Sequence, residues 1–263
     1  MDIANLDTSA LDTAAKFFRT MQKAGANLTG PMQDRTKRRN FVEYLEKGCP
    51  KINDNGEVVT NQLPEGHELA RLILGDDYIT PEEMAEAYSF NYTEEQLEHF
   101  ENTLPDMEKL LQHRQDDSIL YPQPSVEQCL VELVVMNDFQ LEGRWFNEQK
   151  QKFAHEDKTS AGGWLSLRKN GYPGSFNETW QTQKELLSED ERVPNVAEAY
   201  CGFSAYHKIR GVWLLKNKYL RTLSVSAGGR RVDVGGFGGV GLSVGGYWDG
   251  SRGGGLGVSS ARK

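Results

Sequence analysis

Cysteine is scarce in this sequence, and its few residues follow no pattern typical of cross-links or metal sites. Cys49, Cys129 and Cys201 are odd in number, lie far apart and include no CxxC spacing. These features exclude a disulfide framework and do not indicate a zinc site. A reducing compartment is therefore expected.

Long hydrophobic runs are also missing. No stretch approaches the ~18 apolar residues that a membrane-spanning helix requires. The first residues, MDIANLDTSALDTAAKFF, have neither the basic start nor the apolar segment of a signal peptide. We therefore expect a cytoplasmic protein without a membrane segment, while display at the cell surface by a non-standard route stays open.

Residues 228–257 lack Lys, Glu, Gln, Met and Pro altogether, yet they hold 14 of the 27 glycines of the chain. Apolar residues such as Val232, Val234, Leu242 and Val244 stand two apart between the glycines, which is typical of strands with a packing face. A flexible linker has no use for that pattern. Because glycine weakens the interior of a strand, so many glycines need a cause other than folding.

The charge of the chain is unevenly distributed. Residues 221–263 carry six Lys or Arg against two Asp or Glu, whereas the whole chain has a net charge of −8. The negative total argues against nucleic-acid binding along the whole chain. A nucleic-acid-associated protein that uses the basic, glycine-rich C-terminal face is therefore kept as an alternative function.

Residues 1–115 are predicted to form a polar, helical N-terminal region. Apolar residues recur at helical spacing over residues 11–21 and 34–47. Thr80 is followed by Pro and, at the third position, by Glu, while Thr93 has Gln at its third position. Both patterns are capping boxes, so a helix is predicted to begin directly after each threonine.

Residues 116–124 contain two prolines and are predicted to be a linker. Residues 125–263 are predicted to form an α+β domain with an antiparallel sheet. Its expected elements are a half-buried strand, two helices and a run of short strands, at residues 163–169, 177–187, 195–210 and beyond 211.

The glycine-rich tract contains a dinucleotide-binding spacing, GxGxxG, at Gly236, Gly238 and Gly241. That motif also requires a helix directly after the glycines and an acidic residue ~20 positions further on. The following residues, LSVGGYWDG, do not favour a helix. We interpret the spacing as a product of the high glycine content.

The residues of the tract divide into two interleaved sets. The framework set holds the residues that a fold would need: Val225, Gly229, Arg231, Val232, Val234, Gly235, Phe237, Gly241, Leu242, Val244, Trp248, Asp249, Arg252, Leu256, Gly257 and Val258. The variable set holds Ser226, Gly228, Arg230, Asp233, Gly236, Gly238, Val240, Ser243, Gly245, Gly246, Tyr247, Gly250, Ser251, Gly253, Gly254 and Gly255.

Every member of the variable set can be reached from an asparagine codon by changing adenines alone. Lys, Glu, Gln, Met and Trp cannot be reached in this way. The absence of these residue types from the variable set then has a genetic cause.

At this point the chain resembles the variable proteins of diversity-generating retroelements, in the group found in candidate-phylum bacteria and nanoarchaea. The resemblance covers residues 152–263 and can be extended back to residues 78–105. It is carried by KFAHEDKTSAGGWLSLRK, SFNETWQTQKELLSEDERVPNVAEAY, IRGVWLLKNKYLRTLSV and WDGSRGGGLGVSSARK.

The resemblance implies a C-type lectin fold whose gene is rewritten at adenines by an error-prone reverse transcriptase. It implies that the variable set, within a diversified segment of about residues 223–258, is the ligand-binding surface. The expected partner is a variable protein or other macromolecule, and the expected oligomeric state is a monomer. Tyr247, Arg230 and Asp233 are expected to be the strongest contacts of this clone, since the other variable side chains are small.

No catalytic residue, cofactor or metal site is expected. The tract offers Asp233 and Asp249 but few other oxygen ligands for calcium. An enzyme of the formylglycine-generating group, which shares the fold, is a distant alternative because Cys201 falls in a predicted helix. Trp164, Trp180, Trp213 and Trp248 are expected in the core, and Arg231, Arg252 and Arg262 are expected to brace the framework.

Overall fold

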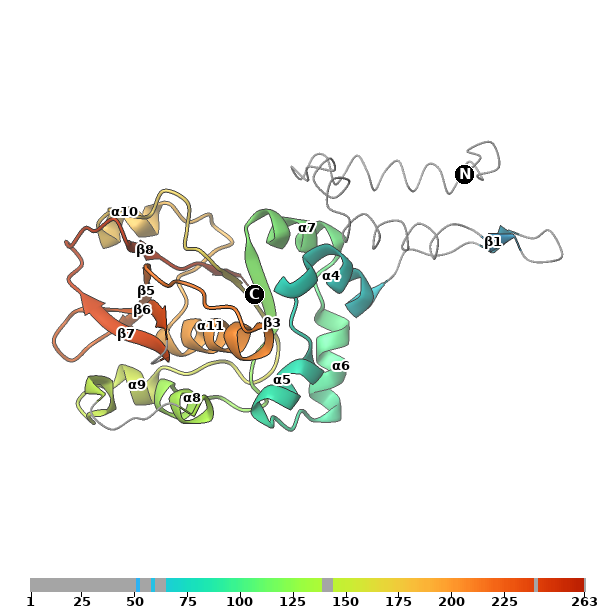
Figure 1. Ribbon diagram of the computed structural model, residues 1–263, viewed down its shortest axis with the longest axis horizontal. Helices are drawn as coiled ribbons and strands as arrows, with labels where there is room; N and C mark the ends of the chain where they lie inside the picture. Colours follow the sequence, from blue (N-terminus) through green and yellow to red (C-terminus); the bar gives the residue numbers. More distant parts are fainter. Residues whose placement is uncertain (1–50, 53–57, 60–64, 139–143, 239–240, 263) are drawn as a thin grey trace.

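The computed structural model describes residues 51–52, 58–59, 65–138, 144–238 and 241–262 (Figure 1). The helices expected over residues 11–21 and 34–47 lie outside the described residues. The described helices are α4 (Gly66–Leu74), η2 (Gly75–Asp77), α5 (Pro81–Tyr88), α6 (Glu94–Thr103), α7 (Met107–Gln115), α8 (Leu130–Met136), η3 (Trp145–Asn147), α9 (Phe153–Glu156), α10 (Trp180–Glu185) and α11 (Val196–Arg210). The described strands are β1 (Lys51–Ile52), β2 (Val58–Val59), β3 (Ser118–Pro122), β4 (Trp164–Arg168), β5 (Tyr219–Val225), β6 (Arg231–Gly238), β7 (Gly241–Tyr247), β8 (Leu256–Val258) and β9 (Ala261–Arg262).

The predicted helix starts are confirmed, and side chains explain each of them. At the start of α5, Thr80 Oγ1 accepts a hydrogen bond from the Glu83 amide, and Glu83 Oε2 accepts one from the Thr80 amide. Thr93 and Gln96 make the same reciprocal pair before α6. These side chains satisfy amides that the first helical turn leaves without partners.

Strands β3, β4 and β9 form a three-stranded antiparallel sheet with β4 in the middle. Leu165 and Leu167 point from β4 into the core that surrounds α11, whereas Trp164 packs in a second cluster with residues of α4, α6 and α7. Both faces of this sheet are therefore covered. For that reason β4 is buried along its whole length. The strand is present as expected, but the expectation that it is half-buried is wrong.

The segment expected to be a linker contains one of the strands of this sheet. Residues 118–122 form β3, which is buried throughout and pairs with β4 in register from Ser118↔Arg168 to Pro122↔Trp164. Pro122 is the last residue of the strand, where a missing amide costs least. The linker prediction for residues 116–124 is therefore corrected: the helices before β3 share the core of the elements after it.

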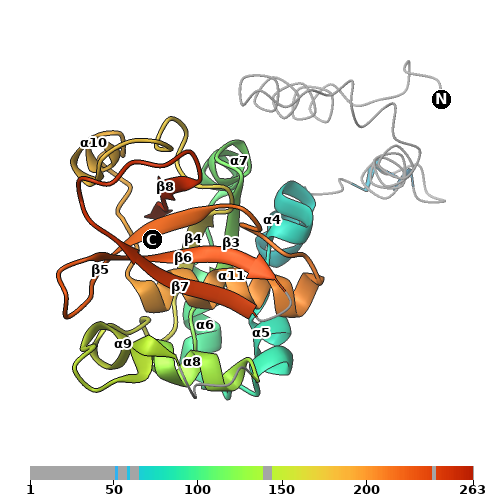
Figure 2. The same ribbon diagram turned by 60° about the vertical axis from the view of Figure 1, so that its left-hand side comes forward.

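Helix α11 is the central element of the fold. Residues 196–206 are all buried, and the helix contacts both sheets as well as α5, α8 and α9 (Figure 2). A Cβ atom at Gly202 would lie 2.8 Å from Leu167 Cδ2 and 2.8 Å from Tyr121 Cε1. Glycine at this position thus lets the helix approach the β3–β4 pair closely.

The second sheet carries most of the glycine-rich tract. Its strand order is β7-β6-β5-β8, with β5 antiparallel to β6, β6 antiparallel to β7, and β5 parallel to β8. Figure 2 shows β5, β6 and β7 lying across α11. The expected α+β class is confirmed, with three differences of detail: the second sheet is mixed and not purely antiparallel, α10 is shorter than predicted, and residues 212–215 form no strand.

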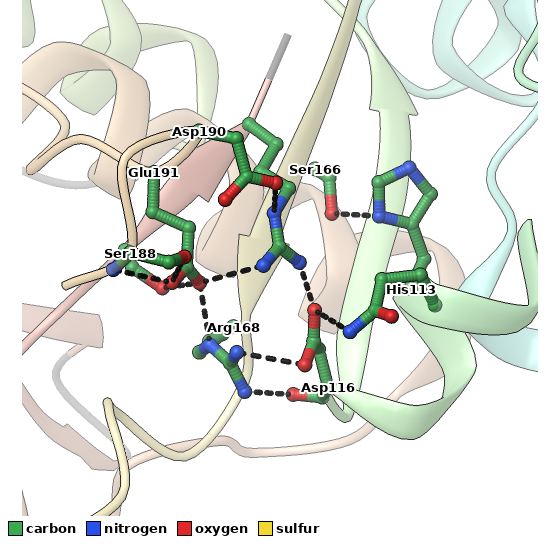
Figure 3. A network of polar contacts seen from close by, with 10 residues as sticks. His113, Asp116, Ser166, Arg168, Ser188, Asp190 and Glu191 are labelled. Carbon is green, nitrogen blue, oxygen red and sulfur yellow. Dashed lines mark hydrogen bonds and ion pairs between the residues drawn. The ribbon is translucent and has the colours of Figure 1, made fainter. Parts of the chain in front are cut away.

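A network of arginines and carboxylates fastens the final strand to the first sheet (Figure 3). Arg168 on β4 contacts Asp116 at 2.7 Å and Glu191 at 3.0 Å. Arg262 on β9 contacts the same two carboxylates and Asp190, at 2.8 Å for the last. The chain therefore leaves the glycine-rich tract and returns to a fixed position in the core.

In the part of the chain that the structure describes, no helix has the length and apolar character that crossing a bilayer requires.

Candidate ligand-binding surface

Most apolar residues of the framework set lie under the second sheet. Their side chains face α11 or the neighbouring core, as expected from the two-residue period of the strands. The buried members are Val232, Val234, Phe237, Leu242, Val244, Leu256 and Val258. The stabilising burial of this segment therefore rests on residues of the framework set.

Most residues of the variable set lie at or near the surface. Gly228, Arg230, Tyr247, Gly250 and Gly254 are exposed. The half-buried members are Gly236, Gly238, Ser243, Gly245, Gly246, Ser251, Gly253 and Gly255. Val240 lies outside the described residues, and Ser226 and Asp233 are buried.

The space around each glycine separates the two sets more sharply than exposure does. A Cβ atom added at Gly228, Gly238, Gly246, Gly250, Gly253 or Gly254 would meet no atom closer than 3.4 Å, and none of these six glycines has a positive φ. Side chains can therefore be added at these variable positions without displacing the backbone.

The glycines of the framework set behave differently. A Cβ atom at Gly235 would lie 1.9 Å from the Lys218 carbonyl oxygen, and one at Gly257 would lie 2.9 Å from the Phe176 ring. Gly229 and Gly241 have φ values of 77° and 93°, which disfavour residues with a side chain. These four positions need glycine for folding.

Three variable glycines have less room. Gly236 has a φ of 57° beside a register shift in β6, and its Cβ atom would lie 2.5 Å from Tyr219 Oη. A Cβ atom at Gly255 would lie 3.0 Å from the Asn217 carbonyl oxygen, in the turn that precedes β5. Gly245 is limited only by a side chain, since its Cβ atom would lie 2.8 Å from Asp233 Oδ1. Because of its positive φ and its close contact with Tyr219, Gly236 is better explained as a framework glycine.

Asp233 does not lie where a ligand could contact it. The residue has an exposed fraction of 0%, and neither carboxylate oxygen has a hydrogen-bond partner among the described residues. Its cross-strand neighbours are Arg221 on β5 and Gly245 on β7. Burial raises the pKa of Asp233 to about 7, although the Arg221 guanidinium opposes this change. The expectation that Asp233 is a strong contact is therefore corrected.

Arg221 holds the loop that follows β7, residues 248–251, in place above the same face of the sheet. Its guanidinium donates hydrogen bonds to the carbonyl oxygens of Trp248 and Ser251, at 3.0 and 2.8 Å, and to Gln183 Oε1 at 2.9 Å. The loop and α10 therefore close over Arg221 and Asp233. The sequence pattern did not single out Arg221, although it is a charged residue inside an otherwise alternating strand.

Ser226 is also withdrawn from the surface. It opens the turn between β5 and β6, where its amide donates to the Arg230 carbonyl oxygen at 2.9 Å and its Oγ accepts from the Arg230 amide at 3.1 Å. These bonds close the turn that presents Arg230. We therefore assign Ser226 to bracing the turn rather than to direct contact.

Two apolar framework residues are exposed, against expectation. Trp248 is 55% exposed and Val225 is 44% exposed, next to Leu223 at 56% and Tyr247 at 42%. Trp164 and Trp180 are buried as expected, and Trp213 is partly buried. The side chain of Trp248 thus lies at the surface, while its carbonyl oxygen accepts a hydrogen bond from buried Arg221.

The basic residues of the tract are largely neutralised within the chain, in agreement with the bracing role expected for them. Arg231 pairs with Asp249 at 3.3 Å and donates to the Leu223 carbonyl oxygen at 2.7 Å. Arg252 lies 3.8 Å from Glu178. Arg230 is different, because its guanidinium lies 5.4 Å from the centre of the Trp248 ring and contacts no carboxylate in the described structure.

The groups that could support metal or thiol chemistry lie elsewhere. Among the described residues no three His, Cys, Asp or Glu side chains come together as metal ligands would. Cys201 is a free thiol inside α11, and burial raises its pKa to about 12. Burial therefore disfavours the thiolate that a reactive cysteine needs.

Comparisons with protein-family models, with curated proteins and with solved structures give no match to this chain.

Proposed function

We propose that this chain is a ligand-binding protein whose C-terminal surface is diversified by adenine-directed retroelement mutagenesis. It would display variable side chains on a fixed C-type lectin-like scaffold and bind variable macromolecular targets. The proposal assigns no catalytic role to the chain.

The observation that carries this proposal is the different space around the two sets of glycines. The sets were separated on the sequence alone, without reference to structure. Yet six variable glycines can accept a side chain, whereas the four framework glycines are held by close contacts or by positive φ. Adenine-directed mutagenesis leaves a protein folded only if its target positions have this freedom. The order of one strand, helices and an irregular sheet also suits the proposed scaffold.

The gene neighbourhood tests the mechanism directly. We expect an adenine-rich near-copy of the coding region for residues 223–262, beside a reverse transcriptase gene, with asparagine codons at the variable positions. A neighbourhood without such a copy would contradict the proposal.

Substitution at matched glycines tests the same division in the protein. Gly250→Tyr and Gly254→Tyr should leave the melting temperature nearly unchanged, because a Cβ atom meets nothing within 4 Å at either position. Gly235→Ala and Gly257→Ala are the controls and should lower it strongly. Equal effects in the two pairs would remove the structural support for a variable surface.

The nucleic-acid alternative receives less support from the contacts of the arginines. Arg231, Arg252 and Arg262 all have carboxylate partners, which leaves a smaller uncompensated charge than the sequence suggested. Salt-dependent binding to DNA or RNA that is lost in Arg230→Ala would favour the alternative.

A further inference from the structure

Three exposed apolar residues stand beside variable positions: Leu223 and Val225 at the end of β5, and Trp248 directly after β7. Val225, Arg231 and Tyr247 are cross-strand partners in one row of the sheet, so their side chains share a face. Trp248 follows Tyr247, and its Cζ3 atom lies 3.7 Å from the Cβ position of Gly229 in the β5–β6 turn. We call Leu223, Val225 and Trp248 the apolar anchor.

The backbone of the apolar anchor is fixed although its side chains are exposed. The Trp248 carbonyl oxygen accepts a hydrogen bond from buried Arg221, and the Leu223 carbonyl oxygen accepts one from Arg231. The Leu223 amide donates to the Pro194 carbonyl oxygen at 2.8 Å. An exposed tryptophan on a rigid backbone loses little conformational entropy when it binds, and tryptophan is enriched at the energetic centres of interfaces.

Residues of the apolar anchor would stay constant while their neighbours vary. Tryptophan cannot be reached from an asparagine codon by changing adenines alone, and Val225 belongs to the framework set. Adenine-directed mutagenesis would therefore leave Val225 and Trp248 unchanged in every variant, while it replaces Arg230 and Tyr247. This step rests on the function proposed above.

The charge next to the apolar anchor indicates the chemistry of a partner. The Arg230 guanidinium lies over the Trp248 ring without a carboxylate partner in the described structure, whereas neighbouring Arg231 is paired with Asp249. A guanidinium that stacks on an indole can still present N–H donors to a carboxylate. The rest of the chain is acidic, so this positive charge distinguishes the patch from its surroundings.

We propose that the apolar anchor is a constant contact of the binding surface, and that in this variant it binds a protein segment with an apolar side chain beside a carboxylate. The constant residues supply the apolar contact. The variable residue Arg230 selects the charge next to it.

Selection from a library of displayed random peptides on the full chain tests this inference. We expect enrichment of peptides in which an aromatic or aliphatic residue adjoins Asp or Glu. For a synthetic peptide from that selection, Trp248→Ala and Val225→Ser should each raise the Kd at least about tenfold, since ~1.4 kcal/mol corresponds to that factor. Val135→Ser on α8, an equally exposed apolar residue away from the surface, is the matched control and should leave the Kd unchanged.

Charge reversal provides the second readout. Selection on Arg230→Glu should yield peptides with Lys or Arg in place of the acidic residue, because the apolar contact remains while the charge is inverted. Selection that yields no binders, or binders without acidic enrichment on the unmodified chain, would overturn the inference. Melting temperatures identify any variant that loses binding through unfolding, and Val225→Ser then replaces Trp248→Ala as the test.

The remaining outcomes separate this inference from the proposed function. If peptide binding depends on Gly250 and Tyr247 but not on Trp248 or Val225, the variable surface stands and the apolar anchor fails. If it depends on Trp248 and Val225 while changes at all variable positions have no effect, the constant apolar contact stands, but the variable surface and the selection of charge by Arg230 both fail. A dimer in sedimentation that becomes monomeric in Trp248→Ala would show that a second copy covers the patch, which contradicts a peptide partner.

Discussion

Asp233 and Gly245 are opposite one another on β6 and β7, and both belong to the variable set. The Asp233 carboxylate occupies the space that a side chain at position 245 would need. Variable positions that share a space cannot change independently. At the scale of single residues, the repertoire of this surface is therefore limited by contacts inside the set as well as by the codons.

Replacing Asp233 by Asn should stabilise the protein at neutral and alkaline pH. In the folded protein the pKa of Asp233 is about 7, above the ordinary value of 3.8. The folded state thus holds a proton that the unfolded chain releases, and the resulting loss of stability grows as the pH rises from about 4 to about 7. We expect Asp233→Asn to increase the free energy of unfolding by up to roughly 4 kcal/mol near pH 8 and by little near pH 4.

Urea unfolding at both pH values measures this effect. Asp249→Asn, at an exposed carboxylate of the same segment, is the control and should not stabilise the protein at pH 8. An Asp233→Asn variant that is no more stable than the parent at pH 8 would show that solvent reaches the carboxylate.

Gly245→Val should be tolerated only when position 233 is small. We expect the substitution to destabilise the parent chain and to have much less effect in Asp233→Gly, with an interaction free energy of about 0.5–3 kcal/mol. A double-mutant cycle followed by thermal unfolding measures the coupling. The pair Gly250 and Asp233 is the control, because nothing lies within 4 Å of a Cβ atom at Gly250; equal coupling in both pairs would contradict the shared space.

Among the secondary-structure elements, α11 determines where the two sheets lie. Its start follows from local chemistry, since Asn195 and Glu198 form a capping box, with the Asn195 side chain accepting from the Glu198 amide at 2.9 Å. Its end follows from Gly211, which adopts the left-handed conformation. Its depth in the fold depends instead on Gly202 and on the residues of β3 and β4 that the helix meets.

Gly202→Ala should destabilise the protein although alanine favours helices. The added methyl group would lie 2.8 Å from carbons of both Leu167 and Tyr121, so overpacking of about 1–3 kcal/mol should exceed the gain of up to ~1 kcal/mol in helix propensity. Calorimetry measures the change. Gly250→Ala is the control at an open position, and a Gly202→Ala protein as stable as the parent would mean that α11 can move away from the sheet.

At the scale of the whole molecule, the network around Arg168 and Arg262 joins distant parts of the chain. Asp116 precedes β3, Glu191 precedes α11, and Arg262 lies in the final strand. The pKa of Glu191 is shifted by burial, which raises it, and by hydrogen bonds from Ser188 and Arg168, which outweigh burial and lower it. The network therefore holds the strand that follows the variable segment in place while the variable surface changes.

Glu191→Gln should destabilise the protein by roughly 3–5 kcal/mol at neutral pH, because two arginines would lose a buried partner. Since the pKa of Glu191 is lowered in the folded state, its stabilising contribution is present above its ordinary pKa of 4.5 and is lost as the pH falls further. The difference between parent and variant should therefore narrow in acid, as chemical denaturation at about pH 7 and pH 3 can show. Glu189→Gln, at an exposed neighbour, is the control; a constant difference at both pH values would contradict the charge-based explanation.

The sequence by itself determined the helix starts at Thr80, Thr93 and Asn195, because capping depends on residues only three positions apart. It also determined that most apolar framework residues of the tract are buried, since alternation in a strand is a local property, although Val225 and Trp248 are exposed. The division of the tract into two sets was likewise made on the sequence, and the space around most of its glycines agrees with it.

Only the tertiary structure decided which polar and aromatic side chains face the solvent. Residues 118–122 were predicted to be a linker because of the nearby prolines. The strand was missed because a strand buried on both faces has no alternating pattern, and its partners lie about 45 positions away in β4. Asp233 is buried and Trp248 is exposed because α10 and the loop held by Arg221 cover one part of the sheet and leave the next part open. Coverage of this kind depends on contacts between distant segments, which residue type and spacing do not encode.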